Sequence, residues 1–165
     1  MKETAIFYGS TSGNCEDIAN KIARALGVSD VFSASQLDKA RIVKYDNMII
    51  GSSTWGCGDL QDEWCDGIEV LRTADLNGKT VALFGCGDSS GFSTTFCDAI
   101  GTLYNAVKSA GAKVIGSVST DGYTFDDSAA VVDGNFVGLA LDEDNESDKT
   151  DGRIAAWIET IGPEL

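Results

Sequence analysis

Short apolar runs alternate along the chain with longer segments of helical periodicity. The short runs are rich in β-branched and aromatic residues and nearly free of charge, which is typical of buried strands. The predicted strands cover residues 4–8, 30–32, 46–51, 80–87 and 113–118, and a further apolar run covers residues 136–141. A polar stretch from Ser119 to Asn135 separates the last two runs.

Between these runs, apolar residues recur every three or four positions, the spacing that places them on one face of a helix. Acidic residues Glu16 and Asp17 fall in the first turn of the first predicted helix. Residues 33–45 contain one helical turn near Ser35 and no other clear element. The four helical sets are Ile18, Ile22, Ala25 and Leu26; Trp64, Ile68 and Leu71; Phe96, Ile100, Leu103 and Val107; and Ile154, Trp157, Ile158 and Ile161.

Strand and helix patterns alternate five times, without a repeat or a linker. This alternation predicts a three-layer α/β domain around a parallel sheet. Right-handed crossovers place the carboxyl ends of all strands at one edge of that sheet. Three loops then meet there, namely residues 9–15, 54–59 and 86–92. In open α/β sheets this is the edge where ligands bind.

Composition narrows the class of protein. With 165 residues, 43% of them hydrophobic, the chain fits one domain spanning residues 1–165. No apolar run approaches the roughly 18 residues of a membrane span, and the amino terminus does not resemble a secretory signal. Five cysteines without a Cys-x-x-Cys pair, and no histidine, argue against metal sites and against hydrolysis with a histidine base. We therefore expect a cytoplasmic protein with free thiols.

The net charge of −14 excludes a nucleic-acid footprint and opposes binding to anionic membranes. This charge is uneven along the chain. Residues 120–165 carry twelve acids against Lys149 and Arg153, a net −10, which leaves −4 for residues 1–119. One interpretation is a soluble acidic surface, which is common; the alternative is a face that steers basic partners to a docking site.

Each of the three loops offers different chemistry. Tyr8–Cys15 leads from a strand through hydroxyls and glycines into a helix start, where backbone N–H groups and the helix dipole favour a phosphate. Since this loop has no lysine or arginine, neutral donors alone would hold that phosphate. Trp55 and Phe92, in the other two loops, are placed to sandwich a flat ring. Together these features describe a mononucleotide such as FMN; the simpler alternative is an ordinary turn, with two aromatic residues capping the sheet edge.

The same loops carry a resemblance to a known family. Residues 9–14 (Gly-Ser-Thr-Ser-Gly-Asn), 54–61 (Thr-Trp-Gly-Cys-Gly-Asp-Leu-Gln) and 87–92 resemble the three flavin loops of the flavodoxins, and residues 120–125 and 138–145 resemble the fifth-strand region of the long-chain subgroup. The resemblance implies a flavodoxin-like sandwich with helices on both faces of a five-stranded parallel sheet of order 2-1-3-4-5. It implies that an insertion at about residues 119–137 interrupts the fifth strand. It also implies non-covalently bound FMN and low-potential one-electron transfer, in place of ferredoxin, rather than enzymatic catalysis.

Carried over position by position, the resemblance predicts cofactor-binding residues and no catalytic or metal-binding ones. Those for the phosphate are Ser10, Thr11, Ser12, Gly13, Asn14 and Cys15. Those for the inner face and edge of the flavin ring are Ser53, Thr54, Trp55, Gly56, Cys57 and Gly58. Those for the outer face and the pyrimidine edge are Cys86, Gly87, Asp88, Phe92, Thr95 and Cys97, and Asp144 is expected near the ring.

Three positions depart from the usual family pattern. Cys15 stands where threonine is usual, so a weak thiol donor replaces a hydroxyl. Phe92 stands in place of tyrosine, which keeps the stacking face and loses the hydrogen bond of a phenol. Ser53 stands in place of a common proline, which leaves the approach to Trp55 less rigid.

By the same resemblance, the partners are redox enzymes with basic patches, such as ferredoxin- or flavodoxin-NADP reductases and oxoacid oxidoreductases, met by a monomer in small, salt-sensitive complexes. An alternative on the same fold is an FMN-dependent NAD(P)H or quinone reductase, which Phe92 disfavours by covering the face that a second substrate needs. A phospho-receiver domain is a further alternative, but it requires clustered acids after the first strand and a lysine after the fifth. The cysteines are expected to be structural, with Cys57 and Cys97 oxidation-sensitive beside a flavin.

Overall fold

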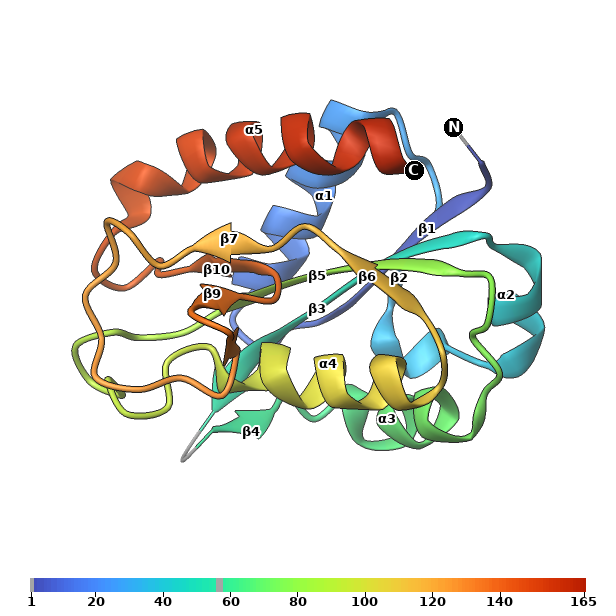
Figure 1. The fold of residues 1–165 in the computed structure, drawn as a ribbon, viewed down its shortest axis with the longest axis horizontal. Helices are drawn as coiled ribbons and strands as arrows, with labels where there is room; N and C mark the ends of the chain where they lie inside the picture. The colour runs from blue at the N-terminus through green and yellow to red at the C-terminus, as the bar shows by residue number, and fades with distance from the viewer. Residues whose placement is uncertain (1, 56–57) are drawn as a thin grey trace.

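A mostly parallel sheet forms the centre of the molecule, in a computed structural model that describes residues 2–55 and 58–165 (Figure 1). Strand β1 (Thr4–Gly9) is flanked by β2 (Val31–Ser33) on one side and by β3 (Asn47–Trp55) on the other. β1 and β3 are buried along most of their length, as expected for parallel strands that are covered on both faces.

Strand β5 (Thr80–Cys86) continues the sheet beyond β3, and the fifth strand follows in two pieces. β6 (Lys113–Ile115) pairs with the first residues of β5, and β10 (Leu139–Leu141) pairs with its last residues. The predicted strand order 2-1-3-4-5 and the interruption of the fifth strand are therefore confirmed, with β6 and β10 together as the fifth strand.

The interruption begins earlier than the sequence indicates. The predicted strand over residues 113–118 stops at Ile115, because Gly116 adopts a φ of 85°, which is not a strand conformation. The Trp157 indole lies against this glycine, so a Cβ atom added there would come within 2.6 Å of it. The residues beyond Gly116 do not return to the main sheet until β10. They form a small antiparallel sheet of order β7-β9-β8, from β7 (Val118–Ser119), β8 (Val131–Val132) and β9 (Asn135–Phe136).

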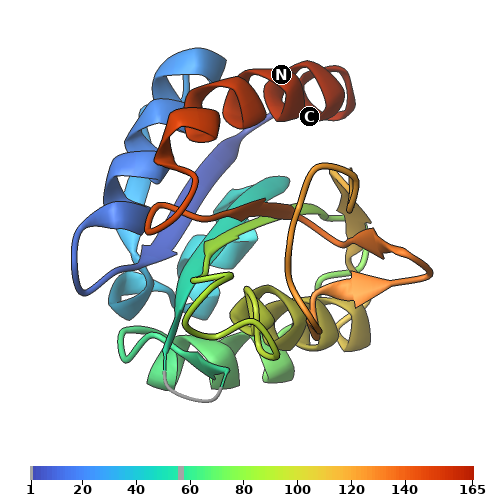
Figure 2. The ribbon, with the colours of Figure 1, turned by 90° about the vertical axis from the view of Figure 1, so that its left-hand side faces the viewer.

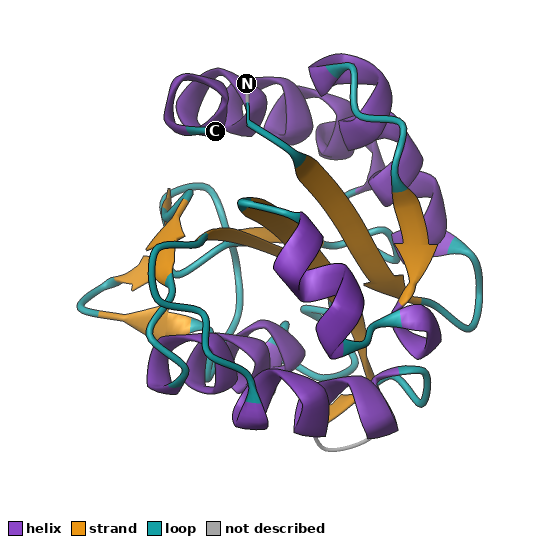
Figure 3. Ribbon diagram, turned by 90° about the vertical axis from the view of Figure 1, so that its right-hand side faces the viewer, coloured by secondary structure: helices purple, strands orange, loops and turns teal. Residues whose placement is uncertain are grey.

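Helices cover both faces of the sheet, which gives the predicted three layers (Figures 2 and 3). α1 (Asn14–Leu26) and α5 (Thr150–Ile161) lie on one face, and α3 (Trp64–Thr73) and α4 (Asp98–Ser109) lie on the other. None of the helices in the described parts of the chain is long and apolar enough to cross a membrane. The shorter elements are α2 (Lys39–Lys44), β4 (Asp59–Leu60) and three 3₁₀ turns, η1 (Ala34–Gln36), η2 (Ser147–Lys149) and η3 (Gly162–Glu164).

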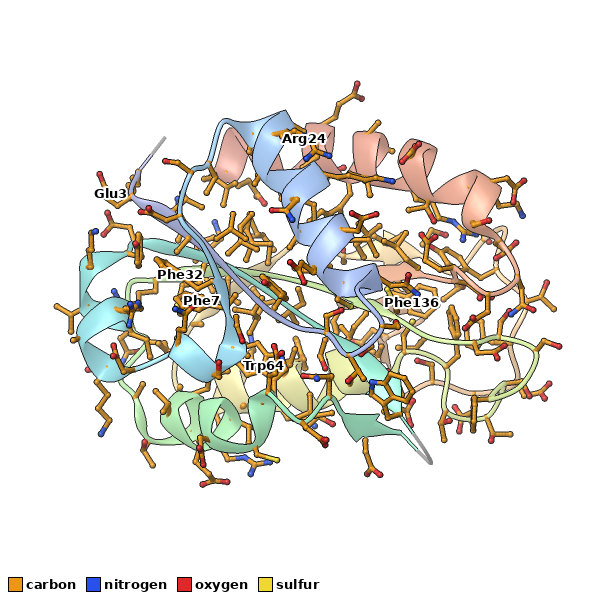
Figure 4. All side chains as sticks on the ribbon, turned by 180° about the vertical axis from the view of Figure 1, so that it is seen from behind. Glu3, Phe7, Arg24, Phe32, Trp64 and Phe136 are labelled. Atoms are coloured by element: carbon orange, nitrogen blue, oxygen red, sulfur yellow. The ribbon has the colours of Figure 1, made fainter. Side chains whose placement is uncertain are left out.

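Each face of the sheet has its own apolar core, and each core includes one buried tryptophan from a covering helix. Trp64 of α3 packs on one side and donates its indole N–H to the Gly51 carbonyl at 2.8 Å (Figure 4). Trp157 of α5 packs on the other side and donates to the Gly116 carbonyl, also at 2.8 Å. Both indoles are buried with their polar atom satisfied, so neither incurs the cost of an unpaired buried donor.

Some helical predictions require correction. The structure has a helix, α2, over residues 39–44, where the sequence predicts none. This helix has only six residues and buries only Ile42, so its sequence shows no helical periodicity. Phe96 is predicted on the third helix, but α4 begins at Asp98, and Phe96 packs instead on Phe125 at 5.5 Å between ring centroids. Ala25, predicted on the apolar face of α1, is exposed.

Candidate functional site

A pocket of about 330 Å³ opens at the carboxyl ends of β1, β3, β5 and β10, the edge viewed in Figure 2. Its volume is in the range of pockets that hold small-molecule ligands. Ten of the predicted residues contribute to its wall: Ser12, Asn14, Ser53, Thr54, Trp55, Cys86, Gly87, Asp88, Phe92 and Asp144. Glu143 completes the wall and was not among the predicted residues, since only its position next to Asp144 could have indicated it.

The β1–α1 loop forms one end of the pocket. Gly13, with a φ of 92°, turns the chain into α1 and leaves the helix without a side-chain cap. The N–H groups of the first turn of α1 are therefore free to bind an anion. The Ser10 hydroxyl accepts from the Gly13 N–H at 3.1 Å, so its own hydrogen is still available as a donor. This loop offers several neutral donors and no cation.

Gln61 holds this loop in place, a role that the sequence reading did not assign. Its side chain is buried, its Nε2 donates to the Thr11 hydroxyl at 2.9 Å, and its Oε1 accepts from the Glu63 N–H at 2.7 Å. Its backbone N–H donates to the Ser52 hydroxyl at 3.1 Å. Through Gln61, the β1–α1 loop is tied to the end of β3. The signal available in the sequence was the position of Gln61 directly after the Trp55 loop.

The end of β3 carries Trp55, which is 44% exposed. Its indole N–H donates to the Ser53 hydroxyl at 2.8 Å, and this bond restrains the ring. The expectation was that serine in place of proline would leave the approach to Trp55 less rigid. The Thr54 hydroxyl accepts from the Ala99 N–H at 3.1 Å. Gly58, with a φ of 101°, lies in the loop that leads from β3 to β4.

Not every predicted residue lines the pocket. Gly56 and Cys57 lie outside the described residues. Thr95 is half-buried and does not line the pocket, and its N–H donates to the Phe92 carbonyl at 3.2 Å. Cys97 is fully buried, with its Sγ 3.7 Å from the Leu141 carbonyl oxygen. Gly58 and the loop residues Ser10, Thr11 and Gly13 do not line the pocket, although the three loop residues neighbour Ser12 and Asn14, which do.

The loop after β5 is folded around the Asp88 carboxylate. This group accepts from the N–H groups of Ser90 at 3.0 Å and Gly91 at 2.8 Å, and from the Asn145 amide at 2.8 Å. The Gly91 N–H, followed by the Asn145 amide, lowers the pKa of Asp88 below its usual value. The turn presents Phe92, which is 49% exposed, at the mouth of the pocket.

Acidic groups gather at this second end of the pocket. Carboxylate oxygens of Asp88, Asp142 and Asp144 lie within 4.8 Å of one another. Asp142 is fully buried and binds the Ser89 hydroxyl and the Asn145 amide, which joins the β5 loop to the segment after β10. Partial burial, followed by the nearby charges of Asp88 and Asp142, raises the pKa of Asp144. An added negative charge would be disfavoured here.

Cys15 does not present its thiol to the pocket. Its side chain is fully buried, and its Sγ lies 3.5 Å from the Sγ of Cys86, which does line the pocket. The hydrogen bond from Cys15, followed by burial, raises the pKa of the Cys86 thiol well above its usual value. The side chain at the position where threonine is usual is therefore not placed to donate to a ligand in the pocket.

Two further hollows, of about 460 and 340 Å³, lie beside the insertion and share Ser117 and Thr160. Neither includes a residue of the three loops. Both hollows are larger than the pocket at the sheet edge, but volume alone does not identify a ligand site. Among the described residues, only the pocket at the sheet edge combines an uncapped helix start with two half-exposed aromatic rings. That donor set fits a flat ring with a phosphate.

The chain is similar to known proteins in sequence and in fold. The profile of the family described as Flavodoxin matches residues 6–157. Flavodoxin 1 of Azotobacter vinelandii is 43% identical over 171 aligned residues, which cover 100% of this chain and 98% of that protein. The flavodoxin of a Synechocystis species is 42% identical over 168 residues, with 100% and 99% covered. A crystal structure of Fusobacterium nucleatum flavodoxin bound to flavin mononucleotide superposes with a TM-score of 0.93, at 34% identity and with 100% and 99% covered.

Proposed function

The chain belongs to the flavodoxin family, in its long-chain subgroup, and we propose that it carries single electrons at low potential on an FMN held in the pocket at the sheet edge. The observation that carries this proposal is that the uncapped amino terminus of α1 and the two half-exposed aromatic rings border the same pocket. The alternative of an NAD(P)H or quinone reductase has no support among the relatives, which are named flavodoxins.

The β1–α1 loop binds the FMN phosphate in this proposal. The first-turn N–H groups of α1 and the hydroxyls of Ser10, Thr11 and Ser12 donate to its oxygens, and Asn14 adds a side-chain amide. Hydrogen bonds to an ionised acceptor are about twice as strong as neutral ones, so several of them hold a dianion without a cation. Gln61 keeps the loop in the required position through Thr11.

Trp55 and Phe92 hold the flavin ring between them and exclude water from its faces. The bound FMN supplies the one-electron chemistry. Asp88 and Asp144, with buried Asp142 behind them, oppose any increase in negative charge on the ring. Each unit charge about 10 Å away costs roughly 1–2 kcal/mol before salt screening at an effective dielectric of about 20. These carboxylates therefore lower the potential of the second one-electron reduction, so the fully reduced protein would be a strong reductant.

The acidic surface favours partners with basic patches around their own redox centres, such as ferredoxin- or flavodoxin-NADP reductases and oxoacid oxidoreductases. We infer that a cytoplasmic monomer meets them in transient, salt-sensitive complexes. The net charge of −14 supports this inference, since complementary charge accelerates encounter more than it strengthens the complex.

Reconstitution of the apoprotein with FMN and with riboflavin tests the site. We expect one FMN to bind per chain and quench the flavin fluorescence, and riboflavin to bind roughly a hundredfold more weakly, because it lacks the charge-assisted bonds to the β1–α1 loop. Trp55→Ala should weaken both flavins alike, which separates ring contacts from phosphate contacts. Equal affinity for FMN and riboflavin would overturn the phosphate assignment.

A further inference from the structure

Two buried thiols meet beneath the pocket. The Sγ of Cys15, in the first turn of α1, lies 3.5 Å from the Sγ of Cys86, the last residue of β5. Each residue is next in sequence to one end of the pocket. Cys15 directly follows the β1–α1 loop, and Cys86 directly precedes the turn around Asp88.

The distance between these thiols is close to that of a disulfide. The S–S bond is about 2.0 Å long, so the two sulfur atoms need to approach by roughly 1.5 Å. Cys97 is also buried nearby, but its Sγ faces the carbonyl oxygens of Gly85 and Leu141, at 3.9 and 3.7 Å. Cys15 is therefore the thiol that is placed to pair with Cys86.

Only one of the two thiols is accessible to a small oxidant. Cys86 lines the pocket and is 6% exposed, whereas Cys15 is fully buried behind it. The raised pKa of the Cys86 thiol keeps the reactive thiolate scarce at neutral pH, so its oxidation is slow there and accelerates as the pH rises.

We propose that Cys15 and Cys86 form a dithiol that hydrogen peroxide oxidises slowly to a disulfide, and that this disulfide weakens FMN binding. The Cys86 thiolate attacks one oxygen of hydrogen peroxide, the O–O bond breaks, and Cys86 becomes a sulfenic acid while hydroxide leaves and takes up the thiol proton as water. The Cys15 sulfur then attacks the Cys86 sulfur, which forms the S–S bond and releases a second water. Two thiols thus lose two electrons and two protons, and one peroxide becomes two waters.

The effect on FMN rests on the proposed function. Drawing Cys15 toward Cys86 moves the first turn of α1, whose N–H groups would bind the phosphate. A displacement of about 1 Å is enough to weaken a preorganised set of hydrogen bonds. We therefore expect the oxidised apoprotein to bind FMN about tenfold more weakly than the reduced one, which corresponds to the loss of one charge-assisted hydrogen bond.

The cross-link is tested on the wild-type apoprotein, treated with hydrogen peroxide and then digested by a protease that cleaves before aspartate. This digestion places each of the five cysteines in a different peptide, with Cys15 in residues 1–16 and Cys86 in residues 75–87. We expect a mass loss of about 2 Da and a dithiothreitol-sensitive link between these two peptides. The link should form faster at pH 9 than at pH 7.

Matched variants identify the thiols involved. Cys15→Ser and Cys86→Ser should abolish the link, whereas Cys65→Ser, at an exposed position on α3, should leave it intact. A link from Cys86 to the peptide of Cys97 would overturn the pairing. So would peroxide treatment that oxidises Cys65 and leaves the masses of the Cys15 and Cys86 peptides unchanged.

Titration with FMN then tests the coupling separately. A tenfold weaker affinity in the oxidised form, restored by dithiothreitol, supports the proposal. Equal affinity of the oxidised and reduced forms would overturn the coupling. If neither form bound FMN, the proposed function would fail, and peptide mapping would still decide whether the disulfide forms.

Discussion

At the α1 end of the pocket the donors are uncharged N–H and hydroxyl groups, whereas three carboxylates gather within 4.8 Å at the β5–β10 end. The two ends lie in one pocket of about 330 Å³ in a chain of net charge −14. One end offers donors to a negative group, and the other opposes one. In the proposed site, local dipoles therefore decide where the phosphate binds, while the carboxylates act on negative charge that the ring gains on reduction.

The two ends also differ in how they are held together. The β1–α1 loop depends on Gln61, which reaches it from the end of β3. The acidic end is held by its own turn, in which the Asp88 carboxylate accepts from Ser90 and Gly91, and by Asn145 across from it. A carboxylate at this end therefore has a structural task as well as an electrostatic one.

Placing a negative charge at the neutral end should have the largest effect. Ser12→Asp brings a carboxylate next to the phosphate position, where two unit charges 4 Å apart repel by about 4 kcal/mol at an effective dielectric of about 20. We expect FMN affinity to fall by at least about a hundredfold, measured by fluorescence titration of the apoprotein. Ser12→Asn is the matched control of similar size and should lose much less. Equal losses in both variants would show that shape, and not charge, governs this end.

Removing the support of the neutral end should have the next largest effect. Gln61→Leu leaves the Glu63 N–H without its partner and the Thr11 hydroxyl without its donor, and a lost buried hydrogen bond costs about 1–3 kcal/mol. We expect both the free energy of unfolding in urea and the affinity for FMN to decrease. Thr11→Val removes the bond between Gln61 and the loop together with a hydroxyl proposed for the phosphate, so the double variant is compared by its free energy of unfolding without FMN, which measures how much of the effect of Gln61 passes through that bond. Strict additivity would contradict the role given to Gln61.

Removing a charge from the acidic end should alter the redox potential more than the affinity. Asp144→Asn should raise the second of the two one-electron potentials by roughly 40 mV, as expected for about 1 kcal/mol of relieved repulsion. Affinity for oxidised FMN should change little, since the oxidised ring is uncharged. Asp133→Asn, at an exposed turn of the insertion, is the matched control. A shift of equal size in both variants would mean that net charge acts and position does not.

Most of the site could be predicted from the sequence because its residues follow directly after buried strands. Thr54 and Trp55 at the end of β3, and Gly87 and Asp88 after β5, occupy places that topology alone brings together. The meeting of the three loops at one edge of a parallel sheet needs only local periodicity and the handedness of crossovers. The strand order 2-1-3-4-5 and the individual cofactor-binding residues came from the family resemblance.

The remainder depended on side-chain directions and backbone turns that no periodicity encodes. The pattern of Lys113–Val118 reads as one strand, but the positive φ of Gly116 ends it early. The thiol of Cys15 faces Cys86 rather than the pocket, which a helix start seen in sequence does not reveal. Gln61 acts across the gap between two loops, and contacts of that kind appear only in three dimensions.

The smallest predicted effect concerns pH, and it separates two neighbouring carboxylates. The folded-state pKa of Asp88 is lowered, so its charge stabilises the fold above the unfolded pKa of about 3.9, and this stability is lost as the pH falls through the lower folded value. The pKa of Asp144 is raised, so its charge opposes folding at neutral pH, and this cost disappears as the pH falls below the unfolded pKa.

Urea unfolding of the apoprotein between pH 7 and pH 3 measures both effects. At pH 7 we expect Asp88→Asn to be less stable than the wild type and Asp144→Asn to be slightly more stable. Both differences should shrink toward zero at the acidic end of the range. Differences of the same sign in the two variants would contradict the assignment, because the turn around Asp88 stabilises its charge through hydrogen bonds, whereas Asp144 is opposed by partial burial and by its acidic neighbours.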